Sequence, residues 1–229
     1  MTELVRSRPP AFVFDLDGTL VDSVYHHVMS WKEALGAAGI DLAMWRIHRK
    51  IGMSGGLFVQ GIQRETGITL SPAEVEALQD AHGRAYAARV DAVEPLPGAP
   101  ELLRYLTDVG IPWTIATSGR RAGAQPMLAK LGAPADLPMV TRDEVARAKP
   151  DPDLFLAGAA RLGVDPAQCV VVGDSIWDLL AARRAGSLGV GLLSGGYGSD
   201  ELQRAHAFRV YDEPADMLAH IDELGVRGR

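Results

Sequence analysis

Short apolar runs alternate with longer segments of helical period along most of this chain. The runs are rich in β-branched residues, and they are Ala11–Phe14, Pro112–Ala116, Leu137–Thr141, Cys169–Val172 and Leu188–Leu193. Apolar runs without an alternating polar face are typical of strands in a parallel sheet that helices cover on both sides. Strands that alternate with helices predict right-handed β-α-β crossovers. We therefore expect an α/β fold whose core is a doubly wound, Rossmann-like parallel sheet.

One long segment interrupts this alternation. No strand candidate appears between Asp22 and Val93, and the segment has several helical patterns instead. Ser71-Pro-Ala-Glu74 predicts the start of one of these helices, because Ser caps a helix, Pro suits the first turn and Glu completes a capping box. A normal crossover takes about a dozen residues or somewhat more, so this segment is too long to be one. We expect residues 22–93 to form a small all-helical domain inserted into an α/β core of residues 1–21 and 94–229.

The composition is that of an ordinary soluble globular protein. Of the 229 residues, 47% are hydrophobic and 23% are charged, and 23 Lys and Arg against 29 Asp and Glu give a net charge of −6. The charge excludes a basic surface for nucleic acid. No run approaches the length of about 18 apolar residues that spans a membrane, and the N-terminus has no apolar signal-peptide core. The single cysteine, Cys169, cannot form an internal disulfide. We expect a cytoplasmic monomer or homodimer with no nucleic-acid or membrane partner.

Polar residues follow the apolar runs where strands would end. They are Asp15 and Asp17 after the first run, Thr117-Ser118-Gly119 after the second, Lys149 beyond Leu137–Thr141, and Asp174 and Asp178 after Cys169–Val172. In an open α/β sheet, ligands bind outside the carboxyl ends of the strands. A single Asp at a strand end is most often a turn or capping residue. Four clusters in this order instead predict one site at one edge of the sheet.

These residue types suit phosphoryl transfer. Several Asp carboxylates packed together repel one another unless a hard cation such as Mg²⁺ neutralises them. Asp15 and Asp17 are two residues apart, so one carboxylate could attack an electrophile while the other handles a proton. The Thr117 hydroxyl and the Lys149 ammonium would neutralise anionic oxygens as charge shifts. The pattern predicts metal-assisted phosphoryl transfer through an aspartyl-phosphate.

On these residues the chain resembles the haloacid dehalogenase-like hydrolase superfamily over nearly its whole length. Asp15-Leu-Asp17-Gly-Thr resembles the first motif of the superfamily, Thr117 the second, Lys149 in Lys-Pro-Asp-Pro the third, and Gly173-Asp174-Ser-Ile-Trp-Asp178 the fourth. The helical insertion after the first motif resembles the C1 cap of the phosphoglycolate phosphatase and β-phosphoglucomutase branch.

The resemblance implies a role for each matched residue. It makes Asp15 the nucleophile and Asp17 the acid and base, while Thr117 and Lys149 bind the transferring phosphoryl group. It implies Mg²⁺ held by Asp15, the Asp17 backbone carbonyl and Asp174, with Asp178 ordering water or Lys149. The candidate substrate contacts are Ser118, Gly119, His27 and Ser54.

Three functions stay open at this point. The leading one is a Mg²⁺-dependent phosphatase acting on a small phosphorylated metabolite, of the sugar phosphate or phosphoglycolate type. The second is a β-phosphoglucomutase-like sugar-phosphate mutase, which Asp22–Trp31 resembles. Thr19 stands where mutases usually carry a branched apolar residue, and Gly55 where they carry an Arg that holds a second phosphate. Asp17 argues against dehalogenation, since a halide leaving group needs no proton. The third is a non-catalytic regulatory or interaction protein on the same scaffold.

Overall fold

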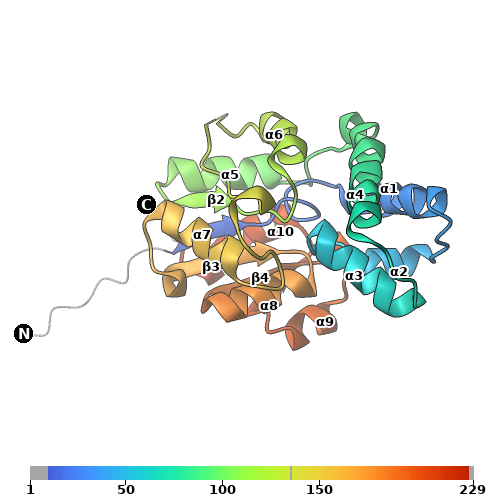
Figure 1. Cartoon of the computed structure of the whole chain (residues 1–229). Helices are drawn as coiled ribbons and strands as arrows, with labels where there is room; N and C mark the ends of the chain where they lie inside the picture. The colour runs from blue at the N-terminus through green and yellow to red at the C-terminus, as the bar shows by residue number, and fades with distance from the viewer. Residues whose placement is uncertain (1–9, 135, 227–229) are drawn as a thin grey trace, which may run out of the picture.

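The core of the molecule is a five-stranded parallel sheet with strand order β2-β1-β3-β4-β5 (Figure 1). The computed structural model describes residues 10–134 and 136–226. The strands are β1 (Ala11–Phe14), β2 (Trp113–Ile115), β3 (Cys169–Gly173), β4 (Leu188–Leu192) and β5 (Arg209–Tyr211). With helices on both faces, this is the predicted doubly wound α/β fold.

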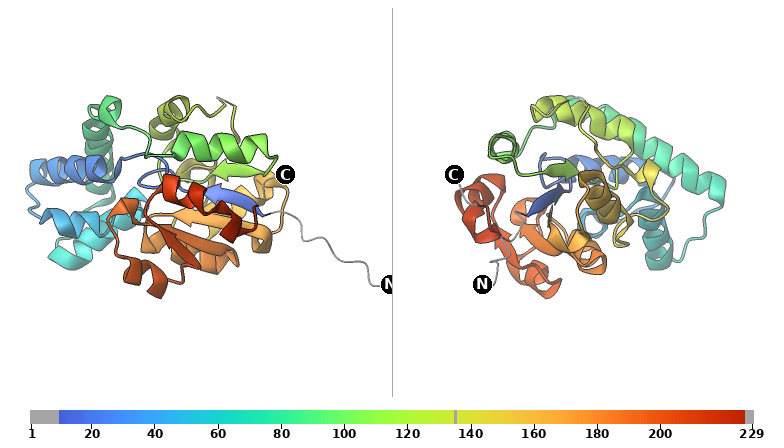
Figure 2. Two further views of the ribbon diagram at one scale, coloured as in Figure 1. Left: turned by 180° about the vertical axis from the view of Figure 1, so that it is seen from behind. Right: turned by 90° about the vertical axis from the view of Figure 1, so that its left-hand side faces the viewer.

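Side chains of β1 explain why the central strands are apolar throughout. Phe12 and Phe14 point to one face, where they pack in a cluster with α5 (Ala99–Asp108), α6 (Arg121–Lys130) and α10 (Pro214–Ala219). Ala11 and Val13 point to the other face, toward α7 (Asp153–Leu162) and α8 (Ile176–Ala185). Figure 2 shows the two helical layers with the sheet between them, and α9 (Ser199–Arg204) beside β4 and β5. Because successive residues of a strand alternate between faces, a strand covered on both sides has no polar face.

A group of four helices lies together at one end of the sheet, on the right in Figure 1. They are α1 (Val24–Ala37), α2 (Met44–His48), α3 (Gly55–Thr66) and α4 (Pro72–Ala87). They share a buried cluster of their own that includes Val28, Trp31, Ile47, Phe58 and Leu78. We call this group the cap. This separate apolar cluster supports the predicted inserted domain, whose bounds 22–93 remain a prediction. Residues 1–9 and 227–229 of the predicted α/β core domain lie outside the described residues.

The predicted start of α4 is confirmed in detail. The Ser71 hydroxyl accepts a hydrogen bond from the Glu74 backbone N–H, and the Glu74 side chain accepts one from the Ser71 N–H, with Pro72 in the first turn. Single-turn 3₁₀ helices complete the chain: Val90–Ala92, Arg142–Glu144, Pro166–Gln168, Leu193–Gly195 and Ile221–Leu224. Within the two described ranges, no helix is both long enough and apolar enough to span a membrane.

The predicted strand at Leu137–Thr141 is wrong. Only Val140 pairs with the sheet edge, through an isolated bridge to Ala116. Pro138 has no N–H to donate to a strand ladder, which confines this segment to a single point of pairing. The structure adds β5, a three-residue edge strand at Arg209–Tyr211 that carries no long apolar run.

Candidate active site

Backbone pairing at the sheet edge sets the positions of the predicted catalytic residues. The Asp15 N–H donates to the Val172 carbonyl at 2.9 Å, so Asp15 leaves β1 beside the end of β3. The Thr117 N–H donates to the Val140 carbonyl at 3.0 Å just beyond β2. The first three predicted clusters meet with cap residues around one cavity of about 1050 Å³, which Asp15, Asp17, Thr117 and Lys149 line together.

Lys149 is fully buried between two carboxylates. Its Nζ lies 2.5 Å from Asp15 Oδ1 and 2.8 Å from Asp178 Oδ1. Burial alone would lower the pKa of Lys149, but the charges of Asp15 and Asp178 outweigh it and raise that pKa above its ordinary value. The ammonium therefore stays charged and holds the Asp15 carboxylate in a fixed orientation.

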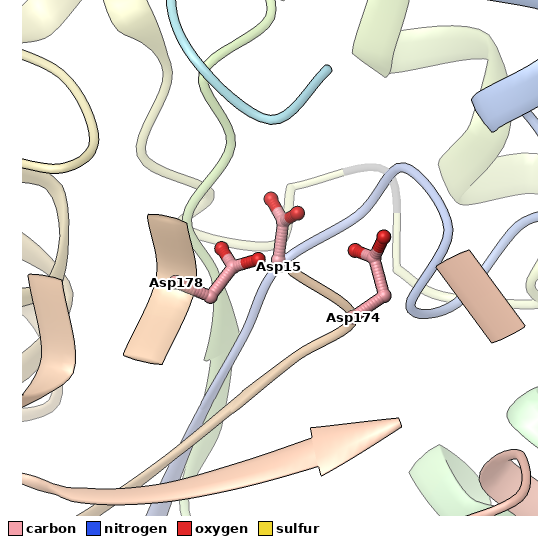
Figure 3. A group of neighbouring side chains, drawn as sticks. All are labelled: Asp15, Asp174 and Asp178. Atoms are coloured by element: carbon pink, nitrogen blue, oxygen red, sulfur yellow. The ribbon is translucent and has the colours of Figure 1, made fainter. Parts of the chain in front are cut away.

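Asp15, Asp174 and Asp178 form a compact, buried group of carboxylates. Each offers an oxygen atom, and these atoms lie within 4.8 Å of one another. Figure 3 shows the three carboxyl groups turned to the same side of the strand ends. Burial raises the pKa of Asp15 to about 7 against the effect of Lys149, and the charges of Asp178 and Asp17 add to the rise. Burial and the charges of Asp178 and Asp15 also raise the pKa of Asp174.

This group fits a divalent metal ion. One ammonium faces three crowded carboxylates, so a second positive charge would relieve the repulsion that helps to raise the pKa values of Asp15 and Asp174. An all-oxygen donor set suits a hard cation. Asp178 already accepts several hydrogen bonds: its Oδ2 accepts from the Ser175 N–H at 3.1 Å and from the Ser175 hydroxyl at 2.5 Å. Asp174 accepts one hydrogen bond from the Thr19 hydroxyl, at 3.1 Å.

Gly173 is needed for the approach of Asp178 to this group. A Cβ on Gly173 would lie 2.3 Å from the Asp178 Cβ, which is far inside any real contact. The glycine therefore allows α8 to start close against the end of β3.

Asp17 does not belong to the carboxylate group and faces the cap instead. The Ser23 hydroxyl donates to Asp17 Oδ1 at 2.6 Å, and His27 Nε2 donates to the same oxygen at 3.1 Å. Burial acts to raise the pKa of Asp17, but the His27 charge, these two hydrogen bonds and Lys149 lower it to about 2. Asp17 is therefore ionised in this arrangement.

His82 of α4 extends this contact into the cap. Its Nε2 lies 3.1 Å from His27 Nδ1, and its ring stacks on Trp31 at 4.2 Å. Burial, with a smaller effect of the His27 charge, lowers the pKa of His82 to about 3, so the ring is neutral. His82 was not among the site residues predicted from the sequence. Its one signal was spacing: His27 and Trp31 on α1, and His82 and Tyr86 on α4, are each four residues apart and so share a helix face.

The predicted substrate contacts all line the cavity, in different ways. The Ser118 hydroxyl is buried without a hydrogen-bond partner in the described ranges, and the Gly119 N–H donates to the Thr117 hydroxyl at 2.9 Å. Ser54 lines the cavity at the start of α3. Both ring nitrogens of His27 already have partners, Asp17 and His82, so we expect His27 to act on the reaction through Asp17 and not by direct contact with the substrate.

The fold and this site define an α/β protein with a helical cap at one end of a parallel sheet and a buried carboxylate cluster at the strand ends. The family model for haloacid dehalogenase-like hydrolases matches residues 9–186. The chain belongs to the haloacid dehalogenase-like hydrolase family.

Known proteins agree with this assignment. The chain is similar to hexitol phosphatase A of Escherichia coli (strain K12), with 35% identity over 78% of this chain and 81% of that protein. It is 31% identical to β-phosphoglucomutase of Bacillus subtilis (strain 168), over 81% of this chain and 84% of that protein. The crystal structure of a hydrolase from Pseudomonas syringae superimposes with a TM-score of 0.91 and 52% identity, covering 93% of this chain and 98% of the other. The predicted family, fold class and enzyme class, a phosphoric monoester hydrolase, are confirmed.

Proposed function

We propose that the chain is a Mg²⁺-dependent phosphatase that hydrolyses a small phosphomonoester, of the sugar phosphate or phosphoglycolate type, through an aspartyl-phosphate on Asp15. The observation that carries the proposal is the buried contact of Lys149 with Asp15 beside Asp174, on the wall of a cavity that the cap covers. Relatives named as phosphatases, such as hexitol phosphatase A, support the same class. We further propose that the enzyme acts in the cytoplasm.

The first step would be attack of the Asp15 carboxylate on phosphorus. A bond forms between Asp15 Oδ and phosphorus, and the bond from phosphorus to the leaving oxygen breaks. Lys149 fixes the attacking carboxylate and, with the Thr117 hydroxyl, neutralises the phosphoryl oxygens. A divalent cation held by Asp15, the Asp17 carbonyl and Asp174 would supply further charge neutralisation.

Protons would move through Asp17. The leaving oxygen needs one proton, and Asp17 is the group placed beside Asp15 to give it. Because Asp17 is ionised in this arrangement, it would have to take up a proton before it gives one to the leaving oxygen, and His27 Nε2, 3.1 Å from Asp17 Oδ1, lies within reach to supply it. In the second step, ionised Asp17 takes a proton from the water that attacks the aspartyl-phosphate, which releases inorganic phosphate and restores Asp15.

A mutase is the second candidate, supported by the identity to β-phosphoglucomutase. A mutase must hand the phosphoryl group to a sugar hydroxyl, which requires a firm site for a second phosphate. At Gly55, where a mutase would carry a cationic side chain, the three atoms nearest to the space for a Cβ all belong to the Gln79 side chain, at 3.4 to 3.8 Å. A charge-assisted contact there would be worth about 1.5–3 kcal/mol, or roughly ten- to a hundredfold in occupancy. Its absence favours the phosphatase.

Release of inorganic phosphate from a panel of phosphorylated metabolites tests the proposal. Wild-type protein with Mg²⁺ should release phosphate from at least one ester, while excess EDTA or Asp15→Asn should abolish release. No release from any ester would support the non-catalytic alternative. Full turnover in EDTA would contradict the metal site.

A further inference from the structure

Uncharged hydrogen-bonding groups without partners gather where α3 begins. Ser54 precedes this helix and is only 5% exposed, and its hydroxyl has no partner in the part of the chain that the structure describes. The N–H groups of Gly55 and Gly56 lie in the first turn, where a helix offers no acceptor. The Gln79 side chain packs beside them, with its Cγ 3.4 Å from where a Cβ on Gly55 would be. We call Ser54, Gly55, Gly56 and Gln79 the α3 cradle.

The α3 cradle faces the reaction centre. All four residues line the cavity that Asp15 and Thr117 also line. The segment just before it rests on the core, because a Cβ on Gly52 would lie 2.9 Å from Ser175 Oγ and 3.2 Å from Trp177 Cδ1. Ser175 stands between Asp174 and Asp178. The leaving group of a phosphate ester held at Asp15 therefore extends toward the α3 cradle.

The cap wall around the cradle is aromatic and carries no free charge. Trp31 and Phe58 are buried and stacked at 4.0 Å. Apart from His27, which Asp17 and His82 engage, Lys50 is the one cation among the buried and half-buried lining residues of the cap that the structure describes, and its ammonium pairs with Glu65. The other charged cap residues on the cavity, Asp80 and Arg84, are exposed.

From this wall we infer that the leaving group is a neutral polyhydroxylated chain or ring, so that the substrate is a sugar or alditol phosphate. The inference rests on the proposed phosphatase function. Hydroxyl groups both donate and accept, which matches the Ser54 hydroxyl, the Gln79 carboxamide and the two glycine N–H groups. A carboxylate only accepts, so it would leave the Gln79 carbonyl unpaired, and a second phosphate would find no free cation on the buried part of the cap wall.

The size of the cavity agrees with this substrate class. Its volume of about 1050 Å³ is at the upper end of roughly 300–1,000 Å³ for small-molecule sites. A two-carbon leaving group such as glycolate would fill less of that space than a six-carbon alditol. Arg84 of the cap and Arg120 of the core, both exposed on the cavity, attract the phosphate dianion during encounter and do not hold a second acid.

The test compares kcat/KM for four esters: a six-carbon alditol phosphate, a sugar bisphosphate, phosphoglycolate and p-nitrophenyl phosphate. Wild-type protein should prefer the alditol phosphate. Ser54→Ala and Gln79→Met should each lower its kcat/KM by about 3- to 10-fold, the size of one hydrogen bond to a neutral group. The loss for p-nitrophenyl phosphate should be smaller, so the ratio between the two esters falls. Gln203→Met is the matched control, since Gln203 lies on α9 and bonds Ser199.

The outcomes separate this inference from the proposed function. Equal losses on all four esters, or a preference for phosphoglycolate or the bisphosphate, would overturn the neutral leaving group while leaving an Asp15-dependent phosphatase intact. A preference for an acid that Arg84→Gln abolishes would place the second anion at the exposed arginines. If wild-type protein hydrolyses none of the esters, p-nitrophenyl phosphate included, the proposed function fails and this inference fails with it.

Discussion

At the scale of single residues, the site depends on how charge is distributed among a few buried groups. Asp15, Asp174 and Asp178 crowd around one ammonium, while Asp17 is held apart by Ser23 and His27. The result is two carboxylates two residues apart with opposite shifts: the pKa of Asp15 rises to about 7, and that of Asp17 falls to about 2. When their surroundings shift the pKa values of two carboxyl groups in opposite directions, the two groups can take different roles in one active site.

Asp15→Asn should abolish turnover without lowering stability. The amide keeps the size of the side chain but is a poor nucleophile, and it removes one of several crowded negative charges while Lys149 keeps Asp178. Phosphate release and urea unfolding in EDTA measure the two effects. Asp108→Asn, on the exposed end of α5, is the control. Retention of even a tenth of wild-type activity would mean that the nucleophile lies elsewhere.

His82→Gln should change how stability depends on pH. The folded-state pKa of His82 is about 3, below the unfolded value of about 6.5. Stability from the neutral ring is therefore complete above about pH 6.5 and is lost as pH falls toward 3, at up to about 1.4 kcal/mol per pH unit. Gln does not titrate, so the free energy of unfolding of the variant does not include this decrease at low pH.

Urea unfolding between pH 7.5 and pH 5 measures the effect. The variant should be less stable than wild type at pH 7.5, because it loses the stacking on Trp31, and the gap should narrow as pH falls. Parallel stability curves for the two proteins would show that His82 does not titrate between the folded and unfolded states.

At the scale of elements, the apolar runs predict the central strands well, because burial on both faces leaves a clear pattern. β1 is Ala11–Phe14 in both the prediction and the structure. The edge of the sheet is harder to predict. Leu137–Thr141 has the composition of a strand, but Pro138 limits it to one bridge, and β5 is short and carries Arg209. Edge strands are decided by their neighbours in space more than by local pattern.

The cap contacts the core through interactions that local sequence pattern does not predict. The Arg49 guanidinium, just after α2, donates to both carboxylate oxygens of Glu201 on α9, at 2.5 and 3.3 Å. It also lies 4.0 Å above the Tyr197 ring, whose hydroxyl donates to the Arg49 carbonyl at 3.1 Å. His48 Nε2 lies 2.7 Å from the Gly195 carbonyl. This contact joins residues about 150 positions apart in the sequence.

A double-mutant cycle of Arg49→Met and Glu201→Gln tests whether this contact holds the cap over the cavity. Gln keeps the capping interaction of position 201 at the start of α9. Each single variant should raise KM about 2- to 5-fold by lowering the fraction of docked cap, and the double variant should add little more. Arg46→Met, whose partner Glu65 lies within the cap, should not couple to Glu201. Additive effects of Arg49→Met and Glu201→Gln would contradict the contact.

At the scale of the whole molecule, the site exists only because the sheet edge and the cap meet. The positions of Asp15, Thr117 and Asp174 could be predicted, since each follows a strand and the carboxyl ends of parallel strands share one edge. Lys149 was predicted to lie there from a run that forms only one bridge, at Val140. His82 and the α3 cradle could not be predicted, because their place depends on how the cap packs against the core. The residues proposed for the chemistry can therefore be located from local sequence pattern. Those proposed to select the substrate cannot, because tertiary packing decides where they lie.

Mg²⁺ should raise the melting temperature of the whole chain, and more so at pH 8 than at pH 5.5. A cation that binds only the folded state stabilises it by mass action. Its ligands must be deprotonated, and the pKa of Asp15 is raised to about 7 and that of Asp174 is also raised, so protons compete with the cation at the lower pH. Thermal unfolding with MgCl₂ and with EDTA at both pH values gives the shift. An undiminished shift in Asp174→Asn would place the cation elsewhere.

The central claim is that Asp15 takes the phosphoryl group and water removes it. A single turnover in ¹⁸O-labelled water, with enzyme in excess over a sugar phosphate and acid quenching at successive times, tests both halves by mass spectrometry of the peptide and the phosphate. We expect a transient phosphorylated peptide containing Asp15, which Asp17→Asn forms and loses more slowly, and then free phosphate carrying one ¹⁸O. An isomeric sugar phosphate with almost no free phosphate, or labelled phosphate without any phosphopeptide, would contradict the account.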